Sequence, residues 1–572
     1  MGNNHIILSA SAALLLSLLL LPALNTRWWS LRSSLVADLL VWNGTIFTSD
    51  PSLPFAEAMA VARGKILRVG NYSSLQEFVG SGTHELNLNG KVVLPGFVDS
   101  HVHFISGGLQ MARVNLREAR SPDIFLTKIK EAVKGKCEGD WILGGGWNND
   151  FWGGEFPVAS WIDEVTPKNP VWLSRMDGHM GLANSLALRI AGITNNTQDP
   201  IGGTVVRSTG GDPTGLLVDS AMKLLLPFIP EASLQERRDA LIRASKYALM
   251  RGVTTVIDFG RFFPGASVDL VWQDFSDVFQ WADSSGEMLV RVCLFFPMQT
   301  WPRLVDLVRE KGIRFSQWIY LGGIKAFSDG SLGSNSALFY EPYIGEPHNY
   351  GLQVMDLDLL LNMTLFSDKS GLQVAIHAIG DKANDMMLDL FSKVGEQNGK
   401  RDRRFRIEHA QHLAAGSASR FGQLGVIASM QPEHLLDDAE SAERKIGIDR
   451  ACRESYLFQS LLRSGAQLAF GSDWPVADVN PLGGIRTATT RIPPGWKHAW
   501  IPSECVSLED ALKAYTISAA HASFLDSDLG SLSTGKLADF VVLSAGSWNE
   551  FTKDVPSSAV LITYVAGVQA YP

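Results

Sequence analysis

Two histidines separated by one residue, His101 and His103, are the residues of this chain best suited to chemistry. Side chains two positions apart on a strand point to the same face, so both imidazoles can reach one metal ion. They end an apolar run that starts at Val92 and also contains Asp99. Two buried imidazoles without a ligand would lose solvation, which weakens the alternative of two purely structural histidines.

Four more ionisable residues end apolar runs further along the chain: Lys325, His377, His409 and Asp473. A lysine inside an apolar strand such as GGIKAF is a costly buried cation, and the alternative to a functional role is an ion pair with Asp329 or another carboxylate. Because active sites of parallel barrels lie at the carboxyl ends of the strands, the shared position of these residues indicates a single site.

The elements that must position these residues form an α/β pattern of apolar runs alternating with helix-like stretches. Such a pattern favours a (β/α)8, TIM-like barrel. The eight runs cover residues 92–104, 252–260, 289–296, 321–330, 372–381, 404–411, 425–432 and 466–475.

Short β-rich segments at both ends of the chain, separated by Gly, Asn and Asp turns, predict a small composite β-sandwich domain. The gap after the first barrel strand, residues 105–250, is too long for one crossover and predicts a large insertion at the barrel mouth. The expected organisation is an N-terminal hydrophobic segment (1–37), the first β-domain segment (38–92), the barrel (93–500), a helical return (501–528) and the second β-domain segment (529–572).

The composition is that of a folded enzyme: 46% of the residues are hydrophobic and the net charge is −9. No Lys/Arg-rich run is present that could neutralise a row of phosphates, so we expect a small-molecule substrate and no nucleic acid. The four cysteines are widely spaced and form no CxxC metal site. Nothing in the sequence indicates the oligomeric state.

Residues 6–24 are almost wholly apolar and close to the length of a membrane span, and Trp28 and Trp29 follow them. This pattern predicts a transmembrane anchor, with a cleaved signal peptide as the alternative, and a membrane-associated location in the endoplasmic reticulum or another endomembrane, including the perinuclear one. Arg27 and Arg32 favour a cytosolic body, whereas a signal anchor would deliver it to the lumen. Sequons at Asn43, Asn71, Asn195 and Asn362 would make a lumenal protein a glycoprotein.

Several motifs together resemble the amidohydrolase superfamily, in its YtcJ-like, family-3 branch, from about residue 38 onward. They are VVLPGFVDSHVHF, GGIKAFSDGSLGSNSALF, IHAIGD, RIEHAQ, GSDWP and GSLSTGKLADFVVL. The resemblance implies that His101, His103 and Asp473 hold one metal ion, that His377 and His409 hold a second, and that Lys325, carboxylated by CO2, bridges the two. If Lys325 is unmodified, a single ion is expected. The ligand types fit zinc best, with iron or manganese as alternatives.

Further motifs resemble substrate-side segments of the same branch. They implicate Trp147 in the GGWN segment, and Arg175 and His179, which could bind a polar end of the substrate; Asp329 and His434 are weaker candidates. The alternatives are insertion core for Trp147 and a hairpin with a solvated charge pair for Arg175 and His179.

We therefore expect a hydrolase that cleaves C–N bonds other than peptide bonds through a metal-activated hydroxide, with Asp473 moving the proton. Ester hydrolysis or ring deamination would use the same site. The resemblance also implies a role in far-red light (phytochrome) signalling. The competing hypothesis is a membrane-anchored regulatory or scaffold protein that retains the fold, since fold alone does not fix function.

Overall fold

The computed structural model describes residues 36–572, and its centre is a parallel barrel of eight strands. The strands follow one another in chain order around the barrel, and β21 contacts β8 to bring the ends together. They are β8 (Phe97–Val102), β15 (Val253–Asp258), β16 (Arg291–Pro297), β17 (Ile319–Phe327), β18 (Gln373–Ala378), β19 (Arg406–His409), β20 (Ile427–Met430) and β21 (Leu468–Phe470). Each of the eight predicted runs overlaps one of them, so the predicted barrel is confirmed.

Helices cover the outside of the barrel and leave the strands buried on both faces, which is why these strands are nearly continuous apolar runs. The longer ones are α6 (Leu234–Met250), α9 (Trp301–Lys311), α10 (Leu357–Lys369), α11 (Asp381–Asn398), α12 (Ser417–Leu424), α13 (His434–Ile446) and α16 (Pro481–Thr490). The shorter ones are α2 (Phe104–Gln110), α7 (Asp269–Asp274), α8 (Gln280–Ser285), α14 (Ile448–Glu454), α15 (Phe458–Arg463), α17 (Leu508–Ala514) and α18 (Ile517–His521).

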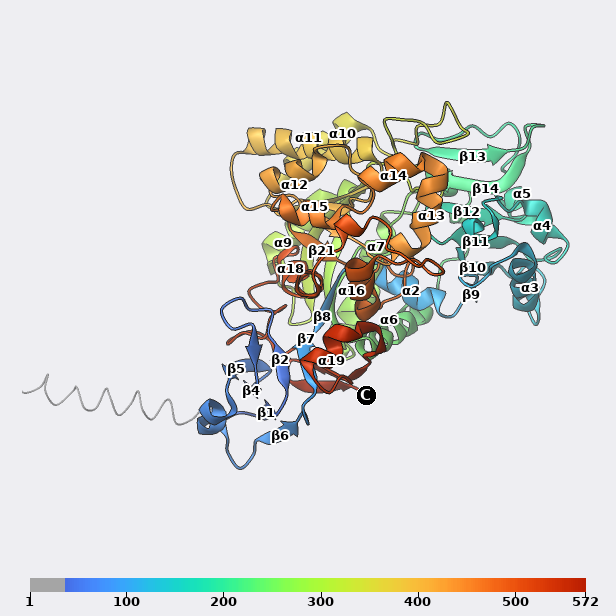
Figure 1. Cartoon of the computed structure of the whole chain (residues 1–572). Helices are drawn as coiled ribbons and strands as arrows, with labels where there is room; N and C mark the ends of the chain where they lie inside the picture. Colours follow the sequence, from blue (N-terminus) through green and yellow to red (C-terminus); the bar gives the residue numbers. More distant parts are fainter. Residues whose placement is uncertain (1–35) are drawn as a thin grey trace, which may run out of the picture.

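Both ends of the described chain build one β-domain, seen at the lower left of Figure 1 in blue and red. One sheet has the order β5-β4-β1-β6 and the other β24-β23-β22-β7-β2-β3. Apolar residues from both sheets, including Val41, Val61 and Phe540, form one buried cluster. The strands are β1 (Leu39–Trp42), β2 (Thr45–Phe47), β3 (Phe55–Ala56), β4 (Ala58–Ala62), β5 (Lys65–Gly70), β6 (His84–Asn87), β7 (Val92–Pro95), β22 (Phe540–Leu543), β23 (Val560–Val565) and β24 (Val568–Tyr571), with helix α19 (Trp548–Lys553).

The insertion is an independent α/β layer on the opposite side of the barrel, drawn in teal in Figure 1. Its six-stranded sheet has the order β13-β14-β12-β11-β10-β9. The elements are β9 (Val114–Asn115), α3 (Pro122–Val133), β10 (Ile142–Trp147), α4 (Ala159–Asp163), β11 (Val171–Arg175), β12 (Met180–Ala183), α5 (Ser185–Ile190), β13 (Gly203–Arg207) and β14 (Pro213–Asp219). α6, at the end of the predicted insertion, packs instead against α2 and β15 of the barrel.

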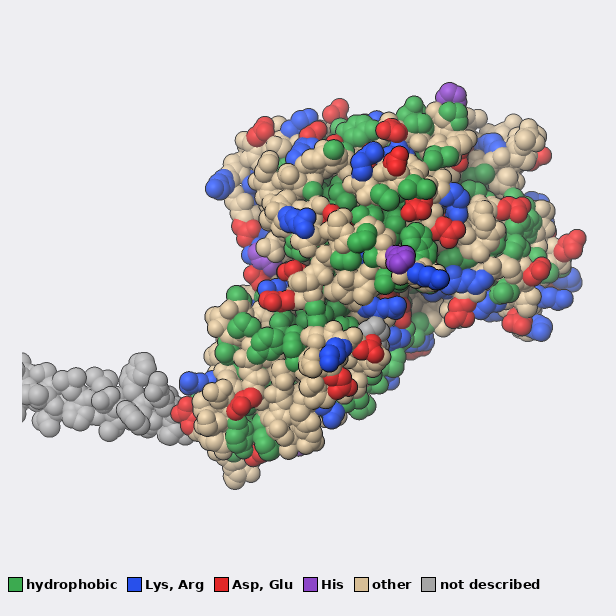
Figure 2. Space-filling model, viewed as in Figure 1, with side chains coloured by type: hydrophobic (Ala, Val, Ile, Leu, Met, Phe, Trp, Pro, Cys, Tyr) green, Lys and Arg blue, Asp and Glu red, His purple; other side chains and the backbone are tan. Residues whose placement is uncertain are grey.

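The surface shown in Figure 2 carries acidic and basic side chains interspersed with one another.

The sequence analysis predicted a transmembrane helix from the apolar residues 6–24. Within residues 36–572, no helix combines the length and the apolar character that a bilayer crossing requires. The transmembrane prediction is therefore wrong for these residues, and the segment on which it rested, residues 6–24, lies outside the described residues.

Close packing between α2 and α6 fixes the segment that follows His103. A Cβ on Gly108 of α2 would lie 2.2 Å from the carbonyl oxygen of Ala240 in α6, whereas a Cβ on Gly395 of α11 would have no neighbour within 4 Å. We predict that Gly108→Ala lowers stability by about 1–3 kcal/mol through overpacking. Gly395→Ala, the matched control, should raise it by about 0.5–1 kcal/mol because helical glycine is unfavourable. Thermal unfolding midpoints that shift in the same direction for both variants would contradict this packing.

Candidate metal centre

The six predicted ligands converge at the carboxyl ends of five barrel strands. His101 lies in β8 and His103 directly follows it; Lys325, His377 and His409 lie near the ends of β17, β18 and β19. Asp473 follows β21. His409 (φ 76°) and Asp473 (φ 56°) both have left-handed backbone conformations, which side-chain-bearing residues rarely adopt. Such strain is found where the surrounding structure holds a functional side chain in place.

Short distances join these side chains. The ring nitrogens Nε2 of His101 and His103 lie 3.5 and 3.4 Å from Oδ1 of Asp473. The ring centroids of His101 and His409 are 5.0 Å apart, and those of His377 and His409 are 4.5 Å apart. One ligand atom from each of His101, His409 and Asp473 fits within a 4.8 Å cluster, a spacing that a single metal ion could bridge.

Four atoms in this cluster are buried polar atoms without a hydrogen-bond partner among the described residues. They are His101 Nε2, Lys325 Nζ, His377 Nδ1 and Asp473 Oδ1. A buried polar atom left unpaired costs free energy, and native proteins rarely tolerate several of them together. Nitrogen and carboxylate donors gathered around one point are the donor set that zinc and similar divalent ions take. The residues present therefore fit a metal.

The opposite nitrogen of each histidine is held by a hydrogen bond that orients the ring. His101 Nδ1 lies 2.7 Å from Glu408 Oε2, and His103 Nδ1 lies 2.6 Å from the Gly260 carbonyl oxygen. His409 Nδ1 lies 2.8 Å from Gln431 Oε1, and His377 Nε2 lies 3.0 Å from the Gly330 carbonyl oxygen. Partners of this kind fix the tautomer and aim the free nitrogen at a metal.

Burial dominates the electrostatics of the cluster. It lowers the pKa values of His101, His377 and His409 well below the usual value, and the nearby Lys325 lowers them further. The neutral imidazole is the form that ligates metals. Burial also lowers the pKa of Lys325, whose Nζ lies 4.4 Å from the ring centroid of Phe259, and raises the pKa of Asp473.

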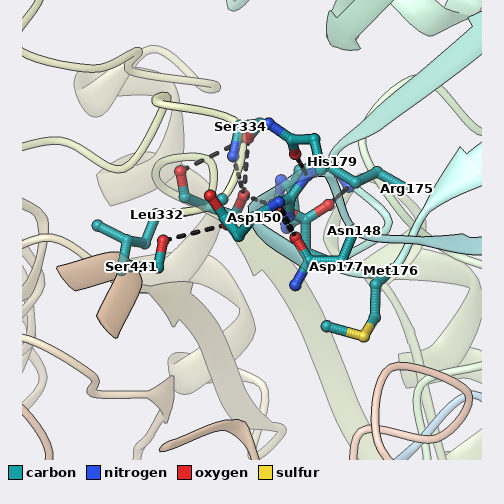
Figure 3. A network of polar contacts seen from close by, with 12 residues as sticks. Asn148, Asp150, Arg175, Met176, Asp177, His179, Leu332, Ser334 and Ser441 are labelled. Atoms are coloured by element: carbon teal, nitrogen blue, oxygen red, sulfur yellow. Dashed lines mark hydrogen bonds and ion pairs between the residues drawn. The ribbon is translucent and has the colours of Figure 1, made fainter. Parts of the chain in front are cut away.

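A cavity connects this cluster to the insertion, and Arg175 and His179 of the insertion line its wall. Arg175 uses four of its five N–H groups within the protein: it bonds to Asn149 and to Asn148, Asp150 and Asp177, the last three of which are labelled in Figure 3. The guanidinium is therefore committed to holding the wall together. Arg175 lines the cavity with one N–H group uncommitted, and its contact with a polar end of the substrate stays a prediction.

His179 lies between the cavity and the buried Asp219, whose Oδ1 is 2.6 Å from His179 Nδ1. Burial lowers its pKa, but the carboxylates of Asp219 and Asp177 outweigh burial and raise the pKa above the usual value. His434, which was also predicted to lie on the substrate side, lines the cavity as well. Its Nε2 lies 3.3 Å from the Ser472 carbonyl oxygen.

Two predicted substrate-side residues do not face the cavity. Trp147 is fully buried in the apolar core of the insertion and donates its Nε1–H to the Leu173 carbonyl oxygen, the position that the alternative of insertion core describes. Asp329 accepts hydrogen bonds from the backbone N–H groups of Leu338, Ile379 and Gly380, and these bonds position the loop beside His377.

Sequence reasoning did not identify Gln431 or the cavity carboxylates Asp150, Asp437 and Asp438. Gln431 follows β20, one of the three barrel strands without a predicted ligand, and this position was the available signal. Asp437 and Asp438 lie in α13, whose amphipathic pattern conceals them as ordinary helix acids.

The sequence and the fold of this chain are similar to those of known proteins. The model described as "Amidohydrolase family" matches residues 84–571. Protein LONG AFTER FAR-RED 3 of Arabidopsis thaliana is 65% identical over 99% of this chain and 98% of its own. The N-substituted formamide deformylase of Arthrobacter pascens is 27% identical over 93% of this chain and 98% of its own. The crystal structure of an uncharacterised metal-dependent hydrolase from Pyrococcus horikoshii is 27% identical, with a TM-score of 0.69, covering 89% of this chain and 97% of the other.

The donor set predicts a metal content that depends on the paired histidines. Protein purified without chelators should contain one or two divalent ions per chain, and His101→Ala combined with His103→Ala should contain close to none. His348, an exposed histidine outside the cluster, provides the control His348→Ala, which should keep the wild-type content. Elemental analysis by mass spectrometry measures all three. A metal-free wild type, or a double variant with unchanged metal, would exclude this centre.

Proposed function

This chain belongs to the amidohydrolase family, and we propose that it is a metal-dependent hydrolase that cleaves C–N bonds other than peptide bonds. The single observation that carries the proposal is the set of four buried, unpaired donor atoms at the carboxyl end of the barrel. An inactive scaffold would gain nothing from keeping four such atoms unpaired, because each one costs stability.

We assign the ligands in two groups. His101, His103 and Asp473 would hold one ion, His377 and His409 a second, and a CO2 adduct on Lys325 would bridge them. Carboxylation suits Lys325 because its amine is fully buried between the rings of Phe259 and Phe327, where an anion shared by two cations costs less than an isolated ammonium. The bound metal would supply Lewis acidity and activate water for attack on the substrate carbonyl.

The chain's own residues supply the proton transfer and the orientation. Asp473 Oδ1 has no hydrogen-bond partner among the described residues and lies at the floor of the cavity. The Asp473 carboxylate can accept the proton of the attacking water and deliver it to the leaving nitrogen. Asp99 holds the segment before Asp473 by accepting the N–H and O–H of Ser472, at 2.8 and 2.6 Å.

The formamide deformylase among the relatives supports a C–N bond in an amide or formamide as the scissile bond. Ester hydrolysis and ring deamination would use the same residues and differ only in the substrate. The name of the 65% identical Arabidopsis relative supports a role in a far-red light response, which we propose depends on the hydrolase. Loss of that response with His101→Ala plus His103→Ala would support the dependence, and its survival would favour a scaffold.

Asp473→Asn keeps the size of the side chain but removes its ability to accept a proton. We predict a fall in kcat of about 100- to 10,000-fold on N-substituted formamides. Asp449→Asn, at an exposed position of α14, is the matched control and should hydrolyse like the wild type. Undiminished hydrolysis by Asp473→Asn would contradict the assigned role, and circular dichroism would show whether the variant is folded.

Carboxylation of Lys325 makes metal loading depend on CO2. Metal-free protein reloaded with zinc in CO2-free buffer should bind about one ion per chain and should gain a second when bicarbonate is added. Lys325→Ala should bind at most one ion under both conditions. Two ions bound in CO2-free buffer would show that the bridge does not need the adduct.

A further inference from the structure

The cavity above the metal centre has an excess of carboxylates. Asp150, Asp177, Asp437, Asp438 and Asp473 all line it, whereas Arg175 is the single Lys or Arg among the lining residues within the described chain. Asp150 and Asp177 are balanced by Arg175 (Figure 3), and Arg444 also binds Asp150. Asp473 belongs to the metal centre. Asp437 and Asp438 of α13 remain to be explained.

These two carboxylates have oxygens that no described residue engages. Asp438 Oδ2 accepts hydrogen bonds from Gln411 Nε2 at 2.6 Å and from the Tyr456 hydroxyl at 2.5 Å, which fixes the orientation of the group. No hydrogen bond of the described chain reaches Asp438 Oδ1 or either oxygen of Asp437. Burial raises the pKa of both groups, that of Asp438 to about 7, the direction expected for carboxylates without a paired cation.

The cations near this wall are all committed elsewhere. Arg117 donates to the carbonyl oxygens of Pro475 and Val476, and the guanidinium of Arg120 lies 3.6 Å from the ring centroid of Phe151. Lys445 Nζ donates to the carbonyl oxygens of Leu332 and Gly333, at 3.2 and 2.6 Å. Arg117 and Arg120 offset part of the charge of Asp437, but neither lines the cavity.

The position of Asp437, but not that of Asp438, can be explained without a ligand. Asp437 lies in the first turn of α13, where a negative charge is favourable because of the helix dipole. That explanation does not account for Asp438, which is fixed by two donors while its other oxygen stays free. It also does not account for the presence of both residues in the same cavity as the unpaired His377 Nδ1 and Asp473 Oδ1.

We propose that Asp437 and Asp438 form a subsite for a positively charged nitrogen, so that the substrate is a small amide or formamide bearing an ammonium group distant from the scissile bond. This inference rests on the proposed hydrolase function. The ammonium would donate to Asp438 Oδ1 and to Asp437 while the acyl carbon lies over the metal centre. A substrate with a carboxylate in that position would meet two like charges, and Arg175 has only one N–H group left to compensate because the other four bond within the protein.

Binding of charged probes tests the subsite independently of catalysis. We expect n-butylammonium to bind the metal-loaded protein at least about 10-fold more tightly than butyrate or 1-butanol, since hydrogen bonds to charged groups contribute measurably. Asp437→Asn combined with Asp438→Asn should abolish the preference. Glu440→Gln, which changes an exposed acid of the same helix, should keep it. Calorimetry measures each affinity, and equal affinity for the three probes would overturn the proposal.

Hydrolysis separates this proposal from the proposed function. N-(4-aminobutyl)formamide should show a kcat/KM about 10- to 100-fold above that of N-butylformamide in the wild type, and the two values should converge in the double variant. Hydrolysis of both compounds without a preference would overturn the subsite and leave the hydrolase intact. If neither is hydrolysed, the hydrolase proposal loses support, while the ammonium preference in calorimetry still decides the subsite.

Discussion

The burial of Lys325 without a protein partner is the constraint on which the centre of this molecule depends. Its ammonium nitrogen is enclosed at the carboxyl end of β17, with aromatic rings as its neighbours, and it donates no hydrogen bond to any described residue. An isolated charge in such surroundings is costly, and either a changed chemical form or a bound ion must compensate for it. The unpaired atoms of His101, His377 and Asp473 belong to the same cluster, so a metal centre formed there would satisfy all four atoms.

Neighbouring side chains of the described residues hydrogen-bond to one another and to the opposite nitrogens of the histidines, so none of them is left to pair with these four atoms. Glu408 holds His101 and is itself held by Arg406, whose Nε lies 2.7 Å from Glu408 Oε1. On the cavity side, Arg175 is held by four partners, so the insertion presents a preformed wall rather than a free guanidinium. The barrel thus supplies the reactive groups, and the insertion together with α13 determines which molecules can approach them.

Strand periodicity and apolar runs were enough to predict the barrel, because buried parallel strands leave a clear signal and the ionisable residues at their ends stand out against it. The run 92–104 shows the limit of that reasoning. It contains two strands, β7 and β8, and β7 pairs with β22 of the β-domain; the β-rich chain ends predicted a composite domain, but not which strands pair across more than 400 residues. The positions of Trp147 and Asp329 outside the cavity were not foreseen for a related reason: a sequence shows which groups are polar or aromatic but not whether their hydrogen bonds are already used inside the protein. Asp437 and Asp438 were missed because acids on a helix are ordinarily solvated.

The central claim is that a divalent metal lies among the buried donor atoms at the carboxyl end of the barrel. Anomalous diffraction from crystals of the zinc-loaded protein, recorded on both sides of the zinc absorption edge, tests it most directly. The account predicts an anomalous peak about 2.0–2.2 Å from ring nitrogens of the clustered histidines and from Asp473 Oδ1. An electron density map that shows these atoms ordered and no anomalous peak among them would contradict it.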